Sequence, residues 1–307
     1  MMTRRDLGKA ALAAIPAATM WGAVNSKFGG VQIGAITYSF RALPSTAEDV
    51  LKYCVETGLS SIELMSDPAE AYAGAPAPPA RGGRQMTPEQ REAIKKYEEE
   101  RKKWRLSVSM DKYKAFRKMY NSAGVDIPIF KLPLTETMSD DEYEYIFTVA
   151  RTLGANCITM ELPTKAEHSK RVGDFATKHK IYIGYHNHTH VDAHSWDVAL
   201  SQSKYNSINL DVGHFTEAIS ASPIPFIKEH HARITSFHLK DKKYGTKGGG
   251  NAKWGQGDTP LKEVLQLMKA EKYKWPADIE LEYDVPADSS VLAEVKTCVK
   301  FCQDALA

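Results

Sequence analysis

One stretch of the sequence decides how the chain is interpreted: Ile183-Gly184-Tyr185-His186-Asn187-His188-Thr189-His190. An apolar run leads directly into three histidines at alternating positions. In an extended strand, residues two apart point to the same side, so the three imidazoles would share one face if the strand continued to His190. Imidazoles near a strand end suit metal binding or proton transfer. The alternative is a polar strand end whose histidines bond to the backbone.

Four other apolar runs end in the same way, in acids, histidines or a lysine. They cover residues 157–163, 208–214, 234–241 and 279–284. Charged groups are rarely buried unless they are paired or bind a metal. Five such runs therefore predict one polar site built from many strands. This is the layout of a (β/α)8 TIM barrel, whose active site collects at the C-terminal ends of parallel strands.

The rest of the chain alternates in a way that fits this fold. We expect strands at residues 31–40, 61–65, 125–132, 157–161, 181–190, 208–211, 234–238 and 279–283. Helices are expected at residues 45–57, 87–105, 109–123, 139–153, 165–179, 223–231 and 289–305, with a further helix beginning at 259–260. Two stretches rich in Gly, Pro or Ala, 68–83 and 245–257, are expected to be long loops beside the site.

Composition limits the class of protein. The 307 residues are 43% hydrophobic and 25% charged, with a net charge of +2. This balance is typical of a soluble globular domain and gives no reason to expect nucleic acid or an acidic membrane surface as a partner. An oligomer is compatible with the sequence. Cys54, Cys157, Cys298 and Cys302 show no metal-binding spacing, and we interpret all four as buried thiols.

The first 27 residues form a unit of their own. Arg4 and Arg5 precede a short apolar run, residues 10–23, that is too short to span a membrane as a mature helix. The paired arginines resemble a twin-arginine export signal, although Leu7-Gly8 stands where Phe-Leu is usual. We therefore expect residues 1–27 to be a signal and residues 28–307 to be a single barrel domain in the periplasm or outside the cell. An uncleaved anchor is the alternative.

At the strand ends the chain resembles the sugar phosphate isomerase/epimerase family, which has a xylose isomerase-like barrel. The most specific pieces are residues 210–214 and 237–241 and the acid of the last strand. The resemblance implies one divalent metal, such as Mn²⁺, Zn²⁺, Co²⁺ or Fe²⁺, held by strands five to eight. Asp211 and His238 carry over as ligands. Glu280 fits the last position best, with Glu282 a close second on the same face.

The fifth strand departs from the family pattern. Where many members have Glu-Asn-His, this chain has His186-Asn187-His188. Either His186 replaces the missing carboxylate as a metal ligand, or Glu161 reaches across from strand four. We favour His186 and keep Glu161 as an added ligand or a base.

The expected chemistry is proton abstraction beside a metal-chelated carbonyl. Glu161 and Glu280 are the candidate bases. Glu63 would contact substrate hydroxyls or take part in catalysis, unless it is a buried acid paired with a barrel lysine or arginine. Five side chains are expected to bind substrate: His188, His214, Lys240, Trp254 and Glu282.

Some of these roles have structural alternatives. His214 and Lys240 would otherwise support the ligands Asp211 and His238. Trp254 and Tyr185 are expected either to stack on a sugar face or simply to pack.

The leading hypothesis is a metal-dependent isomerase or epimerase of a small sugar or keto-sugar. A lyase or hydrolase acting on 3-keto-glycosides would use the same proton abstraction. A third hypothesis is an endonuclease, but the expected export and the weak net charge argue against it. A non-catalytic sugar-binding barrel is the fourth.

Overall fold

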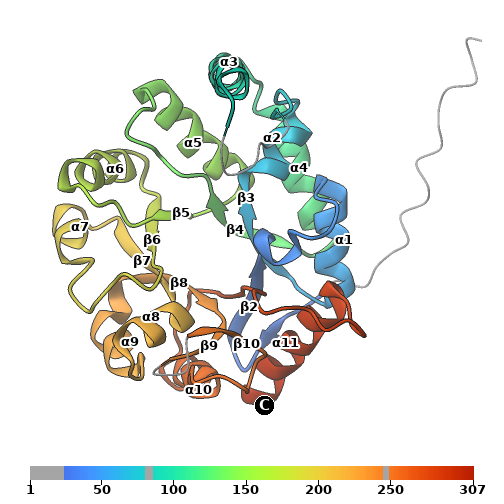
Figure 1. Ribbon diagram of the computed structural model, residues 1–307, viewed down its shortest axis with the longest axis vertical. Coiled ribbons are helices and arrows are strands. Elements are labelled where there is room, and N and C mark those ends of the chain that lie inside the picture. Colours follow the sequence, from blue (N-terminus) through green and yellow to red (C-terminus); the bar gives the residue numbers. More distant parts are fainter. Residues whose placement is uncertain (1–23, 80–85, 245–248) are drawn as a thin grey trace, which may run out of the picture.

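The protein folds as a closed parallel barrel surrounded by helices, which confirms the predicted fold. The computed structural model describes residues 24–79, 86–244 and 249–307. One nine-stranded sheet contains a short antiparallel strand, β1 (Lys27–Phe28), while the other strands are parallel and close through β2 and β3 (Figure 1). The barrel strands are β2 (Val31–Ile36), β3 (Ser61–Met65), β4 (Asp126–Lys131), β5 (Cys157–Glu161), β6 (Tyr182–His186), β7 (Asn206–Asp211), β8 (Ile234–Leu239) and β11 (Ala277–Ile279).

Helices form the outer ring in Figure 1. They are α1 (Ala47–Thr57), α2 (Ser66–Ala73), α3 (Pro88–Arg105), α4 (Asp111–Ser122), α5 (Asp140–Leu153), α6 (Ala166–His179), α7 (Asp197–Gln202), α8 (Val212–Ile219), α9 (Ile224–His230), α10 (Leu261–Glu271) and α11 (Val291–Ala305). Capping boxes at Thr46 and Ser139 begin α1 and α5, and a left-handed glycine ends each of them. Within the described residues, no helix combines the length and the apolarity needed to cross a membrane.

The barrel wall separates an apolar layer from a polar axis. On β6, the buried side chains of Ile183 and Tyr185 belong to the apolar core, whereas Gly184 and His186 alternate with them. Thr159, Asn209 and Asp211 are likewise fully buried polar residues on neighbouring strands. Barrels are usually filled by branched apolar side chains. Here the polar filling brings chemistry to the barrel axis.

Several predicted boundaries were wrong. The first strand ends at Ile36, and Thr37–Phe40 forms a 3-10 helix. The last strand is Ala277–Ile279 rather than 279–283, because the backbone N–H of Leu281 turns to the hydroxyl of Ser39. Part of the predicted loop 68–83 belongs to α2, since Pro68 lies in the first helical turn, where its missing N–H costs nothing.

The described part of the second predicted loop also contains regular secondary structure. β9 (Asp241–Lys243) and β10 (Gly250–Ala252) form an antiparallel pair within or beside it. The carboxylate of Asp241 accepts the backbone N–H groups of Gly255, Gly257 and Thr259 at 2.8, 2.9 and 3.2 Å. Residues 1–23, which hold most of the expected signal, lie outside the described residues, as do 80–85 and 245–248.

Candidate metal centre

Four metal-binding side chains converge at the C-terminal end of the barrel. His186, Asp211, His238 and Glu280 come from β6, β7, β8 and the residue after β11, and each is buried. Each offers a nitrogen or carboxylate oxygen, and these atoms all lie within 4.8 Å of one another. The register explains the meeting, because Asp211 pairs with His238 and Asp278 pairs with His238 on its other side.

In the segment Asp211-Val212-Gly213-His214, the two oxygens of the Asp211 carboxylate have different surroundings. Asp211 Oδ1 caps α8 by accepting the backbone N–H of His214 at 2.7 Å. Its other oxygen, Oδ2, is buried, lies 3.0 Å from the Lys240 ammonium and has no hydrogen bond of good geometry among the described residues. Gly213 is required here, because an added Cβ would meet the carbonyl oxygen of Lys240 at 2.5 Å. Burial raises the pKa of Asp211 to about 6, against the opposing effect of Lys240.

His186 is held with one ring nitrogen available. Its Nδ1 lies 2.7 Å from Asn209 Oδ1, an acceptor oxygen, so Nδ1 carries the proton and Nε2 keeps its lone pair. Burial and then the positive charge of His238 hold the pKa of His186 well below its usual value. β6 ends at His186, so the expected common face reaching His190 does not form, and His190 is exposed.

His238 lies between two carboxylates at the centre of the site. Its Nδ1 is 3.0 Å from Glu280 Oε2 and its Nε2 is 2.8 Å from Glu63 Oε2. Burial alone would lower the pKa of His238, yet the two carboxylates hold it well above the usual value. Likewise, His238 and then Lys240 outweigh burial and hold the pKa of Glu280 well below its normal range.

Lys240 joins the carboxylates of the cluster. Its ammonium lies 3.0 Å from both Asp211 Oδ2 and Glu280 Oε2, and it also contacts Glu282. Although burial opposes it, the charge of Asp211 and then of the two glutamates raises the pKa of Lys240. The ammonium therefore stays charged and neutralises part of the cluster.

His214 lies between two ammonium groups. It is 2.9 Å from Lys240 Nζ and 3.3 Å from Lys242 Nζ. Burial and then these two charges lower the pKa of His214 to about 2. His214 is therefore a neutral hydrogen-bonding group near the cluster.

Glu161 and His188 form a more open pair beside the cluster. The side chains are 53% and 58% exposed, and Glu161 Oε2 lies 3.1 Å from His188 Nε2. Lys131 contacts the other oxygen at 3.5 Å. The hydrogen bond to Glu161 raises the pKa of His188 despite its partial burial. These two residues can exchange protons with a molecule entering from the barrel mouth.

Three of the expected site residues lie elsewhere. Trp254 is 8% exposed and packs edge-on against Phe301 of α11, with ring centroids 5.5 Å apart. Tyr185 points away from the axis, and its hydroxyl donates to Asn206 at 3.2 Å. Glu63 lies inside the barrel rather than at its mouth, fully buried and bonded to His238.

Sequence reasoning missed the residues that orient the cluster. Asn209 fixes the ring of His186, and Asn187 joins two strand ends by accepting the Asp211 N–H at 2.9 Å. Thr159 donates to Glu63 at 2.6 Å. The available signal was an uncharged polar residue alternating inward within an apolar run, as in Asn209-Leu210-Asp211.

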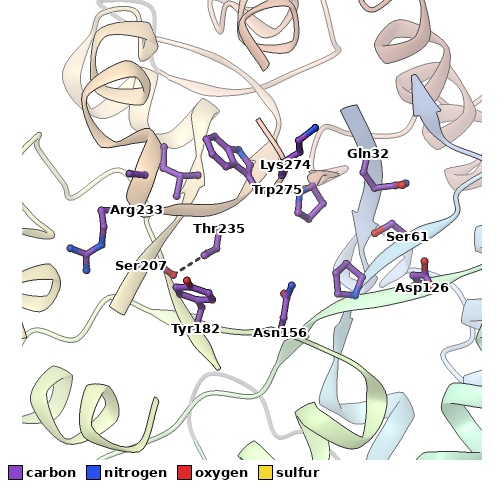
Figure 2. A pocket seen from close by; sticks show the side chains of 14 residues that line it. Gln32, Ser61, Asp126, Asn156, Tyr182, Ser207, Arg233, Thr235, Lys274 and Trp275 are labelled. Carbon is purple, nitrogen blue, oxygen red and sulfur yellow. Dashed lines mark hydrogen bonds between the residues drawn. The ribbon is translucent and has the colours of Figure 1, made fainter. Parts of the chain in front are cut away.

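A large cavity of about 390 Å³ lies at the opposite end of the barrel. Figure 2 shows its lining, which includes Gln32, Ser61, Asn156, Ser207 and Thr235 near the strand starts. The hydroxyls of Ser207 and Thr235 are 3.0 Å apart. Because the cavity holds none of the clustered ligands, we place the chemistry at the other end.

The cluster fits a divalent transition metal. Two imidazoles and two carboxylates make a mixed nitrogen and oxygen donor set of the kind that Mn²⁺, Fe²⁺, Co²⁺ and Zn²⁺ accept. Within the part of the chain that the structure describes, Asp211 Oδ2 contacts the Lys240 ammonium but has no hydrogen bond of good geometry, and the proton of His186 lies on Nδ1, toward Asn209. The four residues of the cluster could therefore hold a metal ion.

Comparison with known proteins agrees with this architecture. Residues 51–300 match the model of a family described as xylose isomerase-like TIM barrel. No curated protein matches the chain significantly in sequence. Similar solved structures include the xylose isomerase domain protein of Planctomyces limnophilus, with 13% identity, coverage of 91% of this chain and 96% of that chain, and a TM-score of 0.59.

Two similar structures are epimerases by name. 3-Keto-D-glucoside 4-epimerase of E. coli is 11% identical, with coverage of 89% of this chain and 100% of that chain and a TM-score of 0.56. D-Psicose 3-epimerase of Clostridium cellulolyticum is 10% identical, with coverage of 90% and 99% and a TM-score of 0.61. At these identities the likeness shows the shared fold.

Proposed function

The chain belongs to the xylose isomerase-like TIM barrel family, and from this premise we propose that it is a metal-dependent isomerase or epimerase of a sugar or keto-sugar. The observation that carries the proposal is the meeting of His186, Asp211, His238 and Glu280 at the C-terminal mouth. Epimerases among the similar folds support the same class of reaction. A bound divalent ion would polarise a carbonyl and its neighbouring hydroxyl and stabilise the charge that develops on them.

Two carboxylates on opposite sides of the barrel supply the proton chemistry. Glu161 ends β5 and Glu280 follows β11, and these strands are four places apart in either direction around the closed ring. A sugar carbon held between them presents one face to each carboxylate. Removal of a proton on one face and return on the other would invert that carbon. The half-exposed Glu161 is the freer base of the two.

Neighbouring groups would bind and orient the sugar. Lys240 and neutral His214 lie beside the carboxylates and can donate to or accept from substrate oxygens. Glu282 and the exposed His188 extend this polar surface. Donors that point at a developing oxyanion lower its energy most when they are held in place beforehand, as these are by their mutual contacts.

Export would narrow the substrate. Residues 1–27 carry the features of a twin-arginine signal, and an exported enzyme seldom meets phosphorylated sugars. We therefore propose an unphosphorylated substrate in the periplasm or outside the cell. Expressing the full chain with an Arg4→Lys, Arg5→Lys variant and measuring its distribution between cell fractions tests this. Equal export of both proteins would contradict it.

Isotope exchange tests the proposed reaction directly. Metal-loaded protein is incubated in D₂O with D-fructose, D-tagatose, D-psicose and methyl 3-keto-glucoside, and the products are followed by NMR and mass spectrometry. We expect deuterium at a carbon next to the carbonyl and an isomer of otherwise equal mass. Asp211→Asn serves as the control. Absence of exchange with every sugar under every metal would favour a non-catalytic sugar-binding barrel.

A lyase or hydrolase of 3-keto-glycosides is a second candidate. The raised pKa of His188 supports it, because a protonated imidazole at the mouth can donate to a leaving glycosidic oxygen. Incubation with p-nitrophenyl 3-keto-glucoside separates the two reactions. Released nitrophenol would identify the lyase or hydrolase, while an isomer that keeps the nitrophenyl group would identify the epimerase.

A further inference from the structure

Glu63 is an acid buried beneath the candidate metal centre, with both oxygens engaged. Its side chain is completely buried on β3. Oε1 accepts the hydroxyl of Thr159 at 2.6 Å, and Oε2 lies 2.8 Å from His238 Nε2. A carboxylate that accepts a hydrogen bond on one oxygen can only act as an acceptor toward a second donor as well. The Nε2 atom of His238 therefore carries a hydrogen that it donates to Glu63.

The same contact decides which nitrogen faces the cluster. His238 Nδ1 lies 3.0 Å from Glu280 Oε2, on the side of the other ligand-type residues. Rotating the ring to exchange its nitrogens would break the bond to Glu63 within a fully buried site. The ring thus has one orientation in which Nδ1 can ligate a metal and Nε2–H has an acceptor.

We propose that Glu63 is a positioning residue that sets the orientation of His238 and keeps its Nε2 protonated when a metal displaces the proton from Nδ1, with Thr159 fixing Glu63 in turn. This inference rests on the proposed metal-dependent function. A carboxylate behind a histidine ligand also increases the basicity of its metal-binding nitrogen. Glu63 acts through His238, since its own oxygens cannot reach a substrate.

A second buried acid, Asp278, shows that burial alone does not direct a carboxylate at the His238 ring. Asp278 is also fully buried, and β11 pairs it with His238 in register. Both of its oxygens lack hydrogen-bond partners among the described residues. Glu63, in contrast, meets two donors from two other strands. The bonded carboxylate is the one directed at the histidine ring.

Metal affinity in matched variants tests the proposal. Metal-stripped Glu63→Gln and wild-type proteins are titrated with Co²⁺ and Mn²⁺ by calorimetry, and the visible spectrum of the Co²⁺ form is recorded. We expect affinity to fall by roughly 10- to 100-fold, with an altered Co²⁺ spectrum in the variant. Thr159→Val, which leaves Glu63 in place, is expected to give a smaller loss of the same kind.

Glu70→Gln is the control for the loss of a buried acid. Glu70 is 3% exposed and bonds Arg105 at 2.7 and 3.0 Å, away from the cluster. This variant should lose thermal stability while its metal affinity stays within about twofold of wild type. Equal affinity in wild type and Glu63→Gln, or equal losses in Glu63→Gln and Glu70→Gln, would overturn the positioning role alone. A wild-type chain that binds neither metal would overturn the proposed function as well.

If Glu63→Gln does not fold, Thr159→Val decides the question. The replacement removes one hydroxyl and keeps the side-chain volume nearly unchanged. A measurable loss of Co²⁺ affinity with an unfolding temperature close to wild type supports the relay from Thr159 through Glu63 to His238. Unchanged affinity in a folded Thr159→Val protein overturns it.

Discussion

The two ends of the barrel use polar side chains in different ways. At the C-terminal end, charged groups bond to one another, as Lys240 does with Asp211, Glu280 and Glu282. At the N-terminal end, polar groups mainly satisfy the backbone. Arg233 donates to the carbonyls of Leu200, Ser203 and Asn206, and Ser207 donates to that of Ile183.

The difference shows where the fold has kept charge that it does not need for stability. Burying several ionised groups together is costly, and well-packed apolar side chains would often stabilise the protein as well or better. Bonds from side chains to backbone carbonyls satisfy groups that must be satisfied in any barrel. The charged end therefore indicates function even though the cavity at the other end is large.

The largest effect is expected at Asp211. Asparagine is a good helix N-cap, so Asp211→Asn should still begin α8 while it removes the carboxylate charge from the cluster. Loss of the metal's stabilisation, several kcal/mol, would lower turnover by about 1,000-fold or more. Elemental analysis of the purified protein and an activity assay measure both effects. A variant that retained metal and turnover would show that the charged end is structural.

Replacing the open carboxylate should have the next largest effect. Glu161→Gln removes the base at the mouth but leaves the four clustered side chains in place. A fall in turnover of about 100- to 10,000-fold is expected for loss of a general base, with the metal still bound. Deuterium exchange and metal content measured on the same sample separate the two. Loss of metal in this variant would instead make Glu161 a ligand, the alternative left open by the sequence.

Lys240 should change metal affinity in the opposite direction. Its ammonium competes with a cation for Asp211 and Glu280, so Lys240→Met should bind Mn²⁺ about tenfold more tightly. Turnover should still fall, because the donor beside the substrate oxygens is gone. Calorimetric titration of the stripped protein measures the affinity. Weaker binding would mean that the lysine supports the metal geometry rather than opposing it.

The sequence was sufficient for the barrel, which follows from local patterns, whereas the four clustered residues were chosen from the resemblance to a known family. Alternation and chain order place Asp211 and His238 at strand ends, and parallel strands bring such ends together. The contacts of Glu63 could not be predicted in this way. Whether an inward acid faces the mouth or a histidine below it depends on contacts between β3, β5 and β8, which no local pattern encodes.

The contacts of Trp254 could not be predicted from a local pattern either. The sequence left two roles open for this tryptophan, stacking on a sugar face or simple packing, and its ring packs on α11. The contact joins residues far apart in sequence, and the anchoring of the segment by Asp241 is equally remote. No local pattern identifies the sugar. The metal cannot be identified from the sequence either, since several ions accept the same donor atoms.

The titration of His188 should show a smaller effect in the metal-free protein. Bonding to Glu161 raises the pKa of His188, and the same pair lowers the pKa of Glu161 after burial is outweighed. The stabilisation that the pair gives to the fold is therefore full between the unfolded pKa values of Glu161 and His188, and it is lost as the pH falls through the folded pKa of Glu161 or rises through the folded pKa of His188. NMR should report a pKa for His188 above 6.5 that falls in Glu161→Gln. An unchanged value would contradict the pairing.

The smallest effect is expected at the N-terminal cavity. Asp126 lines the cavity and is exposed at the start of β4, so its carboxylate is already solvated. Asp126→Asn should leave both turnover and metal affinity within about twofold of wild type, and should change the free energy of unfolding by less than about 0.5 kcal/mol. Assaying it beside Asp211→Asn compares one acid at each end under identical conditions. A large loss of turnover in Asp126→Asn would mean that the two ends are coupled through the polar barrel axis, and the division of labour between them would have to be abandoned.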